Sequence, residues 1–196
     1  AFRHPDLAKA IGSGRHGALA LTLFEWSGPG QQAINFGWRR LDDEASLRRL
    51  ADELVLAPRL IVGGETAIGA AIDFAVDLLA RAPHQAGRLV IDISGDGASN
   101  QGPPVVAARA DALVHGITVN ALAILNEEPG LERYFATAVI GGPGAFVIAT
   151  RDYSDFADAI LRKLIREITT LSHAMRDTGD APESETVKSS QQLMSD

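Results

Sequence analysis

A carboxylate at the end of a buried strand is the first feature of this chain that points to chemistry. An apolar run over residues 88–94 gives way to Gly95, Asp96 and Gly97. In open α/β sheets, ligands bind beyond the carboxyl ends of the strands, where loops carry polar groups that the strands cannot bury. The two glycines permit a tight turn that leaves room beside the carboxylate. Because Mg²⁺ and similar cations prefer oxygen ligands, Asp96 is a candidate metal ligand.

Thr66 is the second candidate metal ligand. It follows the flexible stretch 62–65 and stands where a predicted helix begins. Its hydroxyl can either cap that helix or bind a cation, and its position alone favours capping. Ser94 and Asn100 flank the turn around Asp96 and are candidate supporting residues, which can orient the loop or an outer-shell water. Their residue types favour a role in the turn itself.

Asp92 is a second acidic residue in the same predicted strand. A buried carboxylate needs a polar partner, and Asn120 on the neighbouring predicted strand is the one we expect. Two interpretations of Asp92 stay open. One is a structural hydrogen bond, and the other is a role in a functional site.

The composition is that of an ordinary globular domain and excludes several classes of function. The chain has 196 residues, of which 46% are hydrophobic and 22% charged, and its formal net charge is −7. This charge argues against a broad nucleic-acid-binding face, which draws on clustered Lys and Arg. The absence of cysteine excludes disulfides and thiolate metal sites. No apolar run approaches the roughly 18 residues of a membrane span.

Hydrophobic periodicity predicts strands and helices that alternate along the chain. The strand over 31–38 is expected to be a shorter, more polar partner of the strand before it, so that the two form an edge hairpin. The alternation predicts an α/β fold with a mostly parallel sheet. Strands are expected over 18–26, 31–38, 89–94, 117–124 and 145–149, and helices over 42–58, 66–79, 103–116 and 154–168.

The composition changes near residue 172. From 172 to 196, serines and acidic residues replace the large apolar side chains, and no periodicity is present. Such a segment cannot bury enough surface to offset its ordering entropy. The sequence therefore predicts one domain over 1–171, followed by a polar, disordered tail over 172–196.

The most distinctive motifs of the chain lie in four blocks, residues 66–69, 90–97, 116–120 and 139–146. Together they resemble an uncharacterised bacterial family with a von Willebrand factor A-like fold, from Ala1 to about Ile168. The resemblance implies a doubly wound, mostly parallel sheet flanked by helices, with an antiparallel edge strand. In such domains three loops assemble a metal-ion-dependent adhesion site: an Asp-x-Ser-x-Ser after the first strand, a Thr on a later loop and an Asp after the fourth strand. Thr66 matches the second element and Asp96 the third.

The first element of that site has no counterpart in this sequence. The resemblance begins in what would be the first helix, around residues 2–11, so we expect the chain to be truncated and to lack the family's central first strand. The strands over 18–26 and 89–94 would then lose their shared neighbour and keep unpaired backbone groups. Thr66, Asp96 and water would hold Mg²⁺ or Mn²⁺ weakly. We therefore expect no firmly bound cofactor in this chain, although a full-length protein can have one.

Two classes of function follow. The resemblance implies a binding module for adhesion or assembly, in which an acidic side chain of an unknown protein partner completes the coordination of the cation. The alternative is a metal-assisted hydrolase or phosphoryl-transfer enzyme that uses Asp92 or Asp96 as nucleophile or base. The sequence gives this alternative little support, because it has neither a paired base nor a phosphate loop followed by a helix. The resemblance also implies an extracytoplasmic location.

Overall fold

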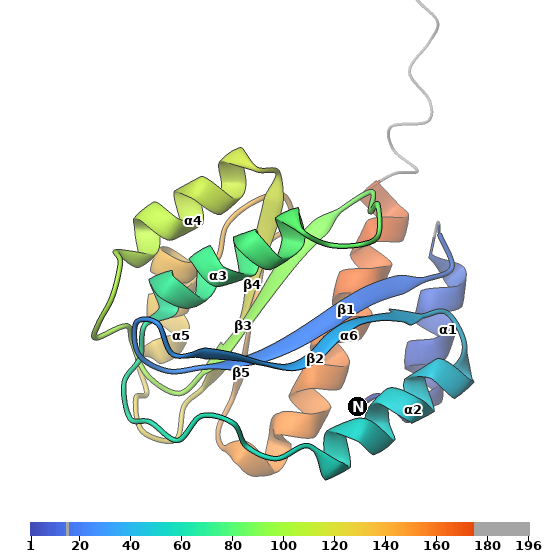
Figure 1. Cartoon of the computed structure of the whole chain (residues 1–196), viewed down its shortest axis with the longest axis horizontal. Helices are drawn as coiled ribbons and strands as arrows, with labels where there is room; N and C mark the ends of the chain where they lie inside the picture. Colours follow the sequence, from blue (N-terminus) through green and yellow to red (C-terminus); the bar gives the residue numbers. More distant parts are fainter. Residues whose placement is uncertain (15, 175–196) are drawn as a thin grey trace, which may run out of the picture.

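Two β-sheets and the helices around them make up the computed structural model, which describes residues 1–14 and 16–174, with side chains as far as residue 169 (Figure 1). Of the tail predicted over 172–196, residues 175–196 lie outside the described part of the chain. In chain order the elements are α1 (Pro5–Ser13), β1 (Leu19–Trp26), β2 (Gln32–Leu41), α2 (Glu44–Leu56), α3 (Ile68–Ala80), β3 (Leu89–Gly95), α4 (Val105–Val114), β4 (Ile117–Ile124), α5 (Leu131–Tyr134), the π-helix η1 (Phe135–Val139), β5 (Val147–Thr150), the 3₁₀ turn η2 (Tyr153–Asp155) and α6 (Phe156–Ala174).

The first sheet is the predicted antiparallel hairpin of β1 and β2. The prediction that the second strand is the shorter one is wrong, because β2 has 10 residues and β1 has 8. Two irregularities in the register, between Leu21 and Phe24, place the extra residues in β2. Such bulges let a longer strand pair with a shorter one.

The second sheet is parallel, with the strand order β3-β4-β5. Every residue of β4 is buried, because α3 and α4 cover one face of this sheet and α6 covers the other (Figure 1). This agrees with the mostly apolar sequence of β4, in which Thr118 and Asn120 are the polar residues. Asp92 of β3 lies opposite Asn120 of β4 in the register.

β1 and β3 do not pair with each other within the described residues, and each keeps one edge without a ladder partner. The sequence predicts this for both strands. Side chains hold the two sheets together instead. Phe24 of β1 makes an edge contact with Phe74 of α3, with ring centroids 5.0 Å apart. Trp26 packs against the main core and approaches Gly95 at the end of β3.

α6 connects the two sheets on the other side. Its residues Leu164 and Ile168 join the core that α1 and α2 form with the hairpin. One turn earlier, Ala159 packs against Leu122 and Ile124 of β4. α6 extends to Ala174, beyond the predicted end at 168. The same helix therefore buries apolar surface against both halves of the fold.

The segment α5 and η1 is absent from the predicted elements. It buries Leu131, Phe135 and Val139 against the parallel sheet. A π-helix does not follow the 3.6-residue period, so its apolar positions give no regular helical signal in the sequence.

Candidate functional site

Thr66 is fixed by its main chain to the loop that follows β3. Its amide donates to Oδ1 of Asn100 at 2.9 Å, and its carbonyl accepts from the Asn100 amide at 2.9 Å. The Ser99 hydroxyl donates to the same carbonyl at 3.1 Å. Asn100 thus orients the loop, as a turn residue can. Ser94, the other candidate supporting residue, lies in β3 opposite Leu122.

The Thr66 hydroxyl faces the turn that carries Asp96. A Cβ atom placed on Gly97 would lie 3.6 Å from Thr66 Oγ1. Within the described residues, the hydroxyl has no hydrogen-bond partner. The tertiary structure therefore brings the two predicted ligands, Thr66 and Asp96, to adjacent loops at the same edge of the sheet.

The expectation that Thr66 caps the following helix is wrong. α3 begins at Ile68, its N-cap is Ala67, and no side chain of the cap residue bonds to the helix. Ser99 takes over part of that role, because its hydroxyl oxygen lies 3.3 Å from the Ile68 amide and accepts its hydrogen. The free amides at the start of a helix can be satisfied by a side chain from a distant loop instead of by the N-cap residue. This leaves the Thr66 hydroxyl available.

The carboxylate of Asp96 is held by a residue that no sequence motif indicates. The Tyr153 hydroxyl donates to Asp96 Oδ2 at 2.7 Å. Burial, reinforced by this hydrogen bond and the Asp96 charge, raises the pKa of Tyr153 to about 12. The phenol is therefore a neutral donor at physiological pH. The one usable signal in the sequence is that Tyr153 follows the last predicted strand, and so lies at the same edge of the sheet as Asp96.

The turn after Asp96 has a second support from the end of β4. The Ala98 amide donates to Oε2 of Glu128 at 2.8 Å. Glu128 lies in the loop between β4 and α5, which the sequence does not single out. Loops that follow three strands, β3, β4 and β5, therefore meet around Asp96.

The end of β1 supports the loop on which Thr66 lies. The Ala67 amide donates to the Ser27 carbonyl at 2.9 Å, and the Ser27 hydroxyl donates to the Glu65 carbonyl at 3.0 Å. Gly69 allows α3 to approach the loop after Asn100, since a Cβ atom there would lie only 2.2 Å from the Pro103 carbonyl oxygen. These contacts join the first and second sheets at the edge where the candidate ligands lie.

Glu25 holds the earlier part of the same loop. Its Oε2 accepts from the amides of Leu60 and Ile61 at 2.9 and 2.8 Å, and its Oε1 accepts from Asn35 at 2.7 Å. Burial alone would raise the pKa of Glu25, but the hydrogen bonds from Ile61, Asn35 and Leu60 outweigh it, so the pKa lies below its ordinary value. The charged carboxylate is therefore the form that anchors the loop.

Asp92 has a different partner from the expected one. The Lys163 ammonium of α6 contacts the Asp92 carboxylate, whereas Asn120 donates to Glu167 and accepts from the Phe146 amide at 3.1 Å. The prediction of an Asp92–Asn120 hydrogen bond is wrong because both side chains face α6, which offers each a charged partner. The Asp92 side chain is 35% exposed, so the expectation that it is buried is wrong as well.

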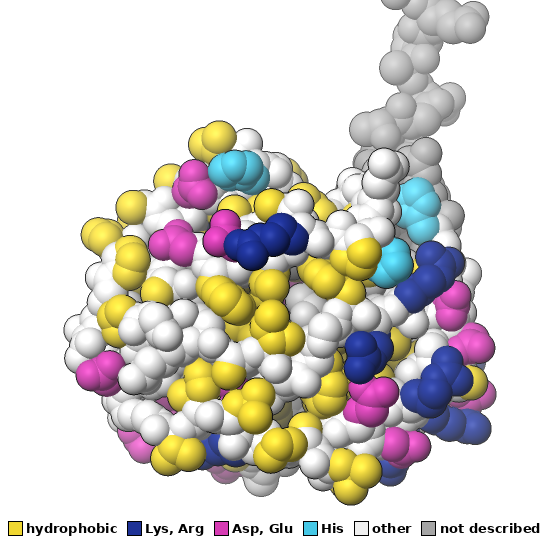
Figure 2. All heavy atoms as spheres, in the orientation of Figure 1, with side chains coloured by type: hydrophobic (Ala, Val, Ile, Leu, Met, Phe, Trp, Pro, Cys, Tyr) yellow, Lys and Arg dark blue, Asp and Glu magenta, His cyan; other side chains and the backbone are white. Residues whose placement is uncertain are grey.

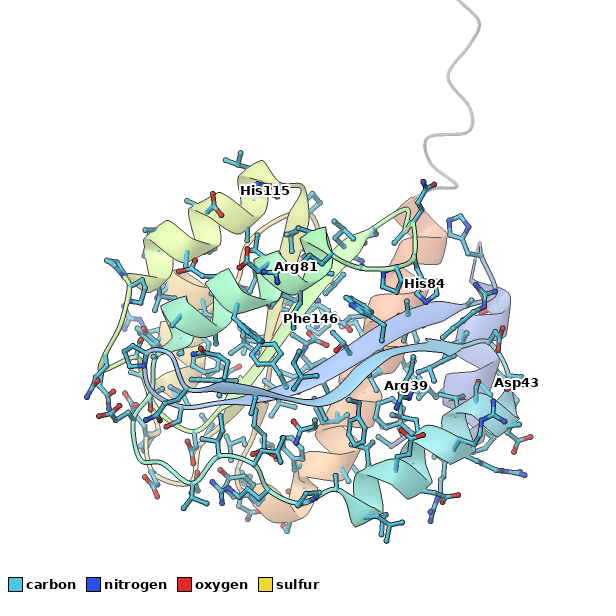
Figure 3. All side chains as sticks on the ribbon, in the orientation of Figure 1. Arg39, Asp43, Arg81, His84, His115 and Phe146 are labelled. Carbon is cyan, nitrogen blue, oxygen red and sulfur yellow. The ribbon has the colours of Figure 1, made fainter. Side chains whose placement is uncertain are left out.

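Aromatic packing completes the surroundings of Lys163. Phe146 lies in the interior of the molecule, as Figure 3 shows, and is 5% exposed. The Lys163 ammonium lies 5.9 Å from its ring centroid, and the Arg166 guanidinium lies 4.1 Å from it. Asp92 therefore belongs to a polar group under α6, away from the loops that carry Thr66 and Asp96.

Charges of both signs are mixed on the face seen in Figure 2. Hydrophobic side chains gather in its middle, around the hairpin and α3, and charged side chains are densest over α1 and α2. Several of the latter form ion pairs, such as Arg39 with Glu53 at 3.2 Å and Arg40 with Asp42 at 2.9 Å. This face therefore offers no basic surface for phosphate groups, in agreement with the acidic composition.

The donor set of the candidate site suits a hard cation but is small. A hydroxyl and a carboxylate oxygen are ligands that Mg²⁺ and Mn²⁺ accept. Among the described residues, no group of three or more His, Asp or Glu side chains lies close enough to hold a metal ion. Over the same part of the chain, no helix combines the length and the apolar character that crossing a membrane requires.

Comparison with solved structures shows the fold. Proximal thread matrix protein 1 from the mussel byssus is similar with a TM-score of 0.54 and 16% identity, over 84% of this chain and 40% of that one. A second structure of that protein, with a zinc-occupied MIDAS motif, has a TM-score of 0.53 and 17% identity over 84% and 41% of the two chains. The hypothetical protein BatB from Bacteroides thetaiotaomicron matches with a TM-score of 0.48 and 16% identity, over 84% and 85%.

The fold is von Willebrand factor A-like, with a parallel sheet flanked by helices and an antiparallel strand pair. The chain spans about two fifths of the length of the byssus protein. No curated protein matches the sequence. A family model described as "Protein of unknown function (DUF1194)" matches residues 1–172, and the chain therefore belongs to that family.

Proposed function

We propose that this domain is a protein-binding module for adhesion or assembly, with Thr66 and Asp96 as ligands of a divalent cation, Mg²⁺ or Mn²⁺. The observation that carries the proposal is the Thr66 hydroxyl. It faces the Asp96–Gly97 turn from a neighbouring loop and has no hydrogen-bond partner within the described residues. A hydroxyl and a carboxylate that come from two rigidly joined loops are a suitable start for an octahedral cation site.

The surroundings of the two side chains support this role. Thr66 is held through its backbone by Asn100 and Ser99, so its position does not depend on its hydroxyl. Preorganised ligands lose less entropy when an ion binds. The byssus protein of similar fold, in which a MIDAS motif is occupied by zinc, supports the proposal that a domain of this fold can bind a divalent cation.

We propose further that a strand belongs between β1 and β3 in the complete domain and that its following loop supplies the remaining oxygen ligands. The support is that both strands keep one edge without a ladder partner, while side chains at their ends remain in contact. Unpaired edges inside a sheet leave backbone groups without partners, which is costly. This chain alone would then bind a cation weakly, through two side chains and water.

The partner that this module would bind carries an exposed carboxylate. A cation held by one carboxylate and one hydroxyl keeps positive charge and open coordination positions, which an acidic side chain of another protein can fill. The partner's identity does not follow from these residues. An extracytoplasmic location remains an expectation from the family resemblance.

Calorimetric titration with Mg²⁺ and Mn²⁺ tests the cation site. We expect weak binding by this chain and a loss of binding in both Asp96→Ala and Thr66→Ala. Glu127→Ala is the matched control, because it removes one exposed charge at the same edge of the sheet without touching a proposed ligand. If Glu127→Ala weakens binding as much as Asp96→Ala, the cation is attracted by general charge and the proposed site is wrong.

A form of the protein extended upstream of Ala1 tests the additional strand. We expect it to bind the cation at least about tenfold more tightly, since added oxygen ligands replace water. Amide hydrogens of β1 and β3 that face each other should also exchange more slowly than in this chain. Unchanged exchange at those amides would contradict the additional strand, whatever the affinity.

A further inference from the structure

Tyr153 connects the proposed cation ligand Asp96 to η2, an element outside the three loops of the metal-ion-dependent adhesion site described above. It lies in η2, between β5 and α6, and β4 separates β5 from β3, the strand that ends directly before Asp96. The segment after β5 therefore reaches past the end of β4 to place the phenol 2.7 Å from Asp96 Oδ2.

The backbone that presents Tyr153 is well fixed. Asp152 caps η2, with its Oδ1 accepting from the Ser154 amide at 2.8 Å. The Tyr153 ring also lies beside that of Phe156, with centroids 6.4 Å apart. Tyr153 is 57% exposed, and its backbone cap and the Phe156 ring together orient its hydroxyl toward the Asp96 carboxylate.

Tyr153 is the one described side chain that fixes the Asp96 carboxylate. Within the described residues, the Tyr153 hydroxyl is the single hydrogen-bond donor to that carboxylate. A carboxylate with one oxygen engaged by a hydroxyl donor has a second oxygen that can bind an ion. Groups that hold a metal ligand in this way commonly change metal affinity by about 10- to 100-fold.

We propose that Tyr153 is the positioning residue of the cation site, holding Oδ2 of Asp96 so that the other carboxylate oxygen is the one that binds the ion. This inference rests on the proposed function. A purely structural role, in which the hydrogen bond only ties the start of α6 to β3, predicts the same contact but no effect on the ion.

Nuclear magnetic resonance of the full chain with ¹³Cζ-labelled tyrosine tests the contact, because the chain has only two tyrosines, Tyr134 and Tyr153. Asp96→Asn should move the Tyr153 resonance and leave that of Tyr134 in place. A Tyr153 resonance that does not respond to Asp96→Asn overturns the inference.

A titration with Mg²⁺, followed at the Gly97 amide, tests the effect on the ion and detects even millimolar binding. Tyr153→Phe should weaken Mg²⁺ binding by about tenfold, as loss of a group that orients a metal ligand does. Thr22→Val is the control and should keep the wild-type affinity, because it also removes a single hydroxyl hydrogen bond, the one that Thr22 donates to the Phe36 carbonyl within the hairpin.

The outcomes separate the two proposals. Equal Mg²⁺ affinity in Tyr153→Phe and the wild type overturns the positioning role and leaves the cation site standing. No response of Gly97 to Mg²⁺ in the wild type overturns the cation site, and the positioning role with it. A tenfold loss confined to Tyr153→Phe supports both.

Discussion

The ammonium group of Lys163 in α6 contacts the carboxylate of Asp92 in β3, a strand that has one edge without a ladder partner among the described residues. The lysine side chain is 1% exposed, and Glu167 Oε1 lies 3.6 Å from the same nitrogen. Taking an ammonium group out of water is costly unless carboxylates compensate for it. α6 also packs in the core that includes the hairpin, so this ion pair ties β3 of the second sheet to a helix that contacts both sheets.

The buried lysine should make stability depend on pH in the alkaline range. Burial lowers the pKa of Lys163 from 10.5 to about 8, against the opposing effect of the Glu167 carboxylate. Between these two values the folded protein has released the proton and the unfolded chain still binds it, so unfolding takes up a proton. The free energy of unfolding therefore rises with pH in this window, and below it the dependence disappears.

Urea denaturation of the wild type and of Lys163→Met at about pH 7 and about pH 9.5 measures this effect. We expect the free energy of unfolding of the wild type to rise by about 2 kcal/mol relative to the variant between the two conditions, since each pH unit above the folded pKa contributes about 1.4 kcal/mol. If the free energy of unfolding changes equally in the wild type and Lys163→Met between the two pH values, the contact with Asp92 keeps the pKa of Lys163 near its ordinary value.

Removing the charge of Glu25 should loosen the loop that leads to Thr66. Glu25→Gln keeps the shape of the side chain but weakens the hydrogen bonds that the amides of Leu60 and Ile61 donate. We expect the free energy of unfolding to fall by about 1 kcal/mol near neutral pH. The folded pKa of Glu25 is lowered, so this stabilisation is present above the pKa of the unfolded chain and is lost as the pH falls through the folded pKa.

Chemical denaturation of Glu25→Gln and the wild type at neutral pH and at about pH 3 checks both parts of that prediction. Glu53→Gln is the control, because Glu53 pairs with Arg39 on the surface and such exposed pairs contribute about 0.5 kcal/mol or less. A difference between Glu25→Gln and the wild type that persists at the lower pH would show that the charge is not what anchors the loop.

Gly69 should tolerate no side chain. Gly69→Ala would place a methyl group 2.2 Å from the Pro103 carbonyl oxygen, so α3 and the loop after Asn100 must separate. We expect the free energy of unfolding to fall by about 1–3 kcal/mol, the range for substitutions that overpack a core. Because this loop holds Thr66, chemical shifts around Thr66 and Asn100 should change too.

Gly12→Ala is the matched substitution for Gly69→Ala. Gly12 also lies in a helix, α1, but a methyl group there would meet nothing within 4 Å. We expect Gly12→Ala to stabilise the protein by about 0.5–1 kcal/mol, since alanine loses less backbone entropy in a helix than glycine. Thermal unfolding of both variants would reveal opposite shifts, and equal losses would rule out the close approach at Gly69 as the cause.

Local patterns in the sequence determined most of the elements and the edge of the sheet where the candidate ligands lie. β4 spans the predicted residues 117–124, a mostly apolar run that suits a strand covered on both faces. Asp43 caps α2 as the acidic start of that helix predicts. The glycine-flanked Asp96 and the Thr66 loop follow from the same kind of local signal, which depends only on neighbouring residues.

The tertiary structure alone decided which side chains meet. Tyr153 and Asp96 are 57 residues apart, and Thr66 and Asn100 are 34 apart, so no short-range period relates them. Periodicity assigns a residue to a face of its helix or strand, as it does for Asp92, but the residue opposite depends on how α6 lies across both sheets. That placement arises from apolar burial in separate cores, and it gives Asp92 a lysine and Asp96 a tyrosine as their partners.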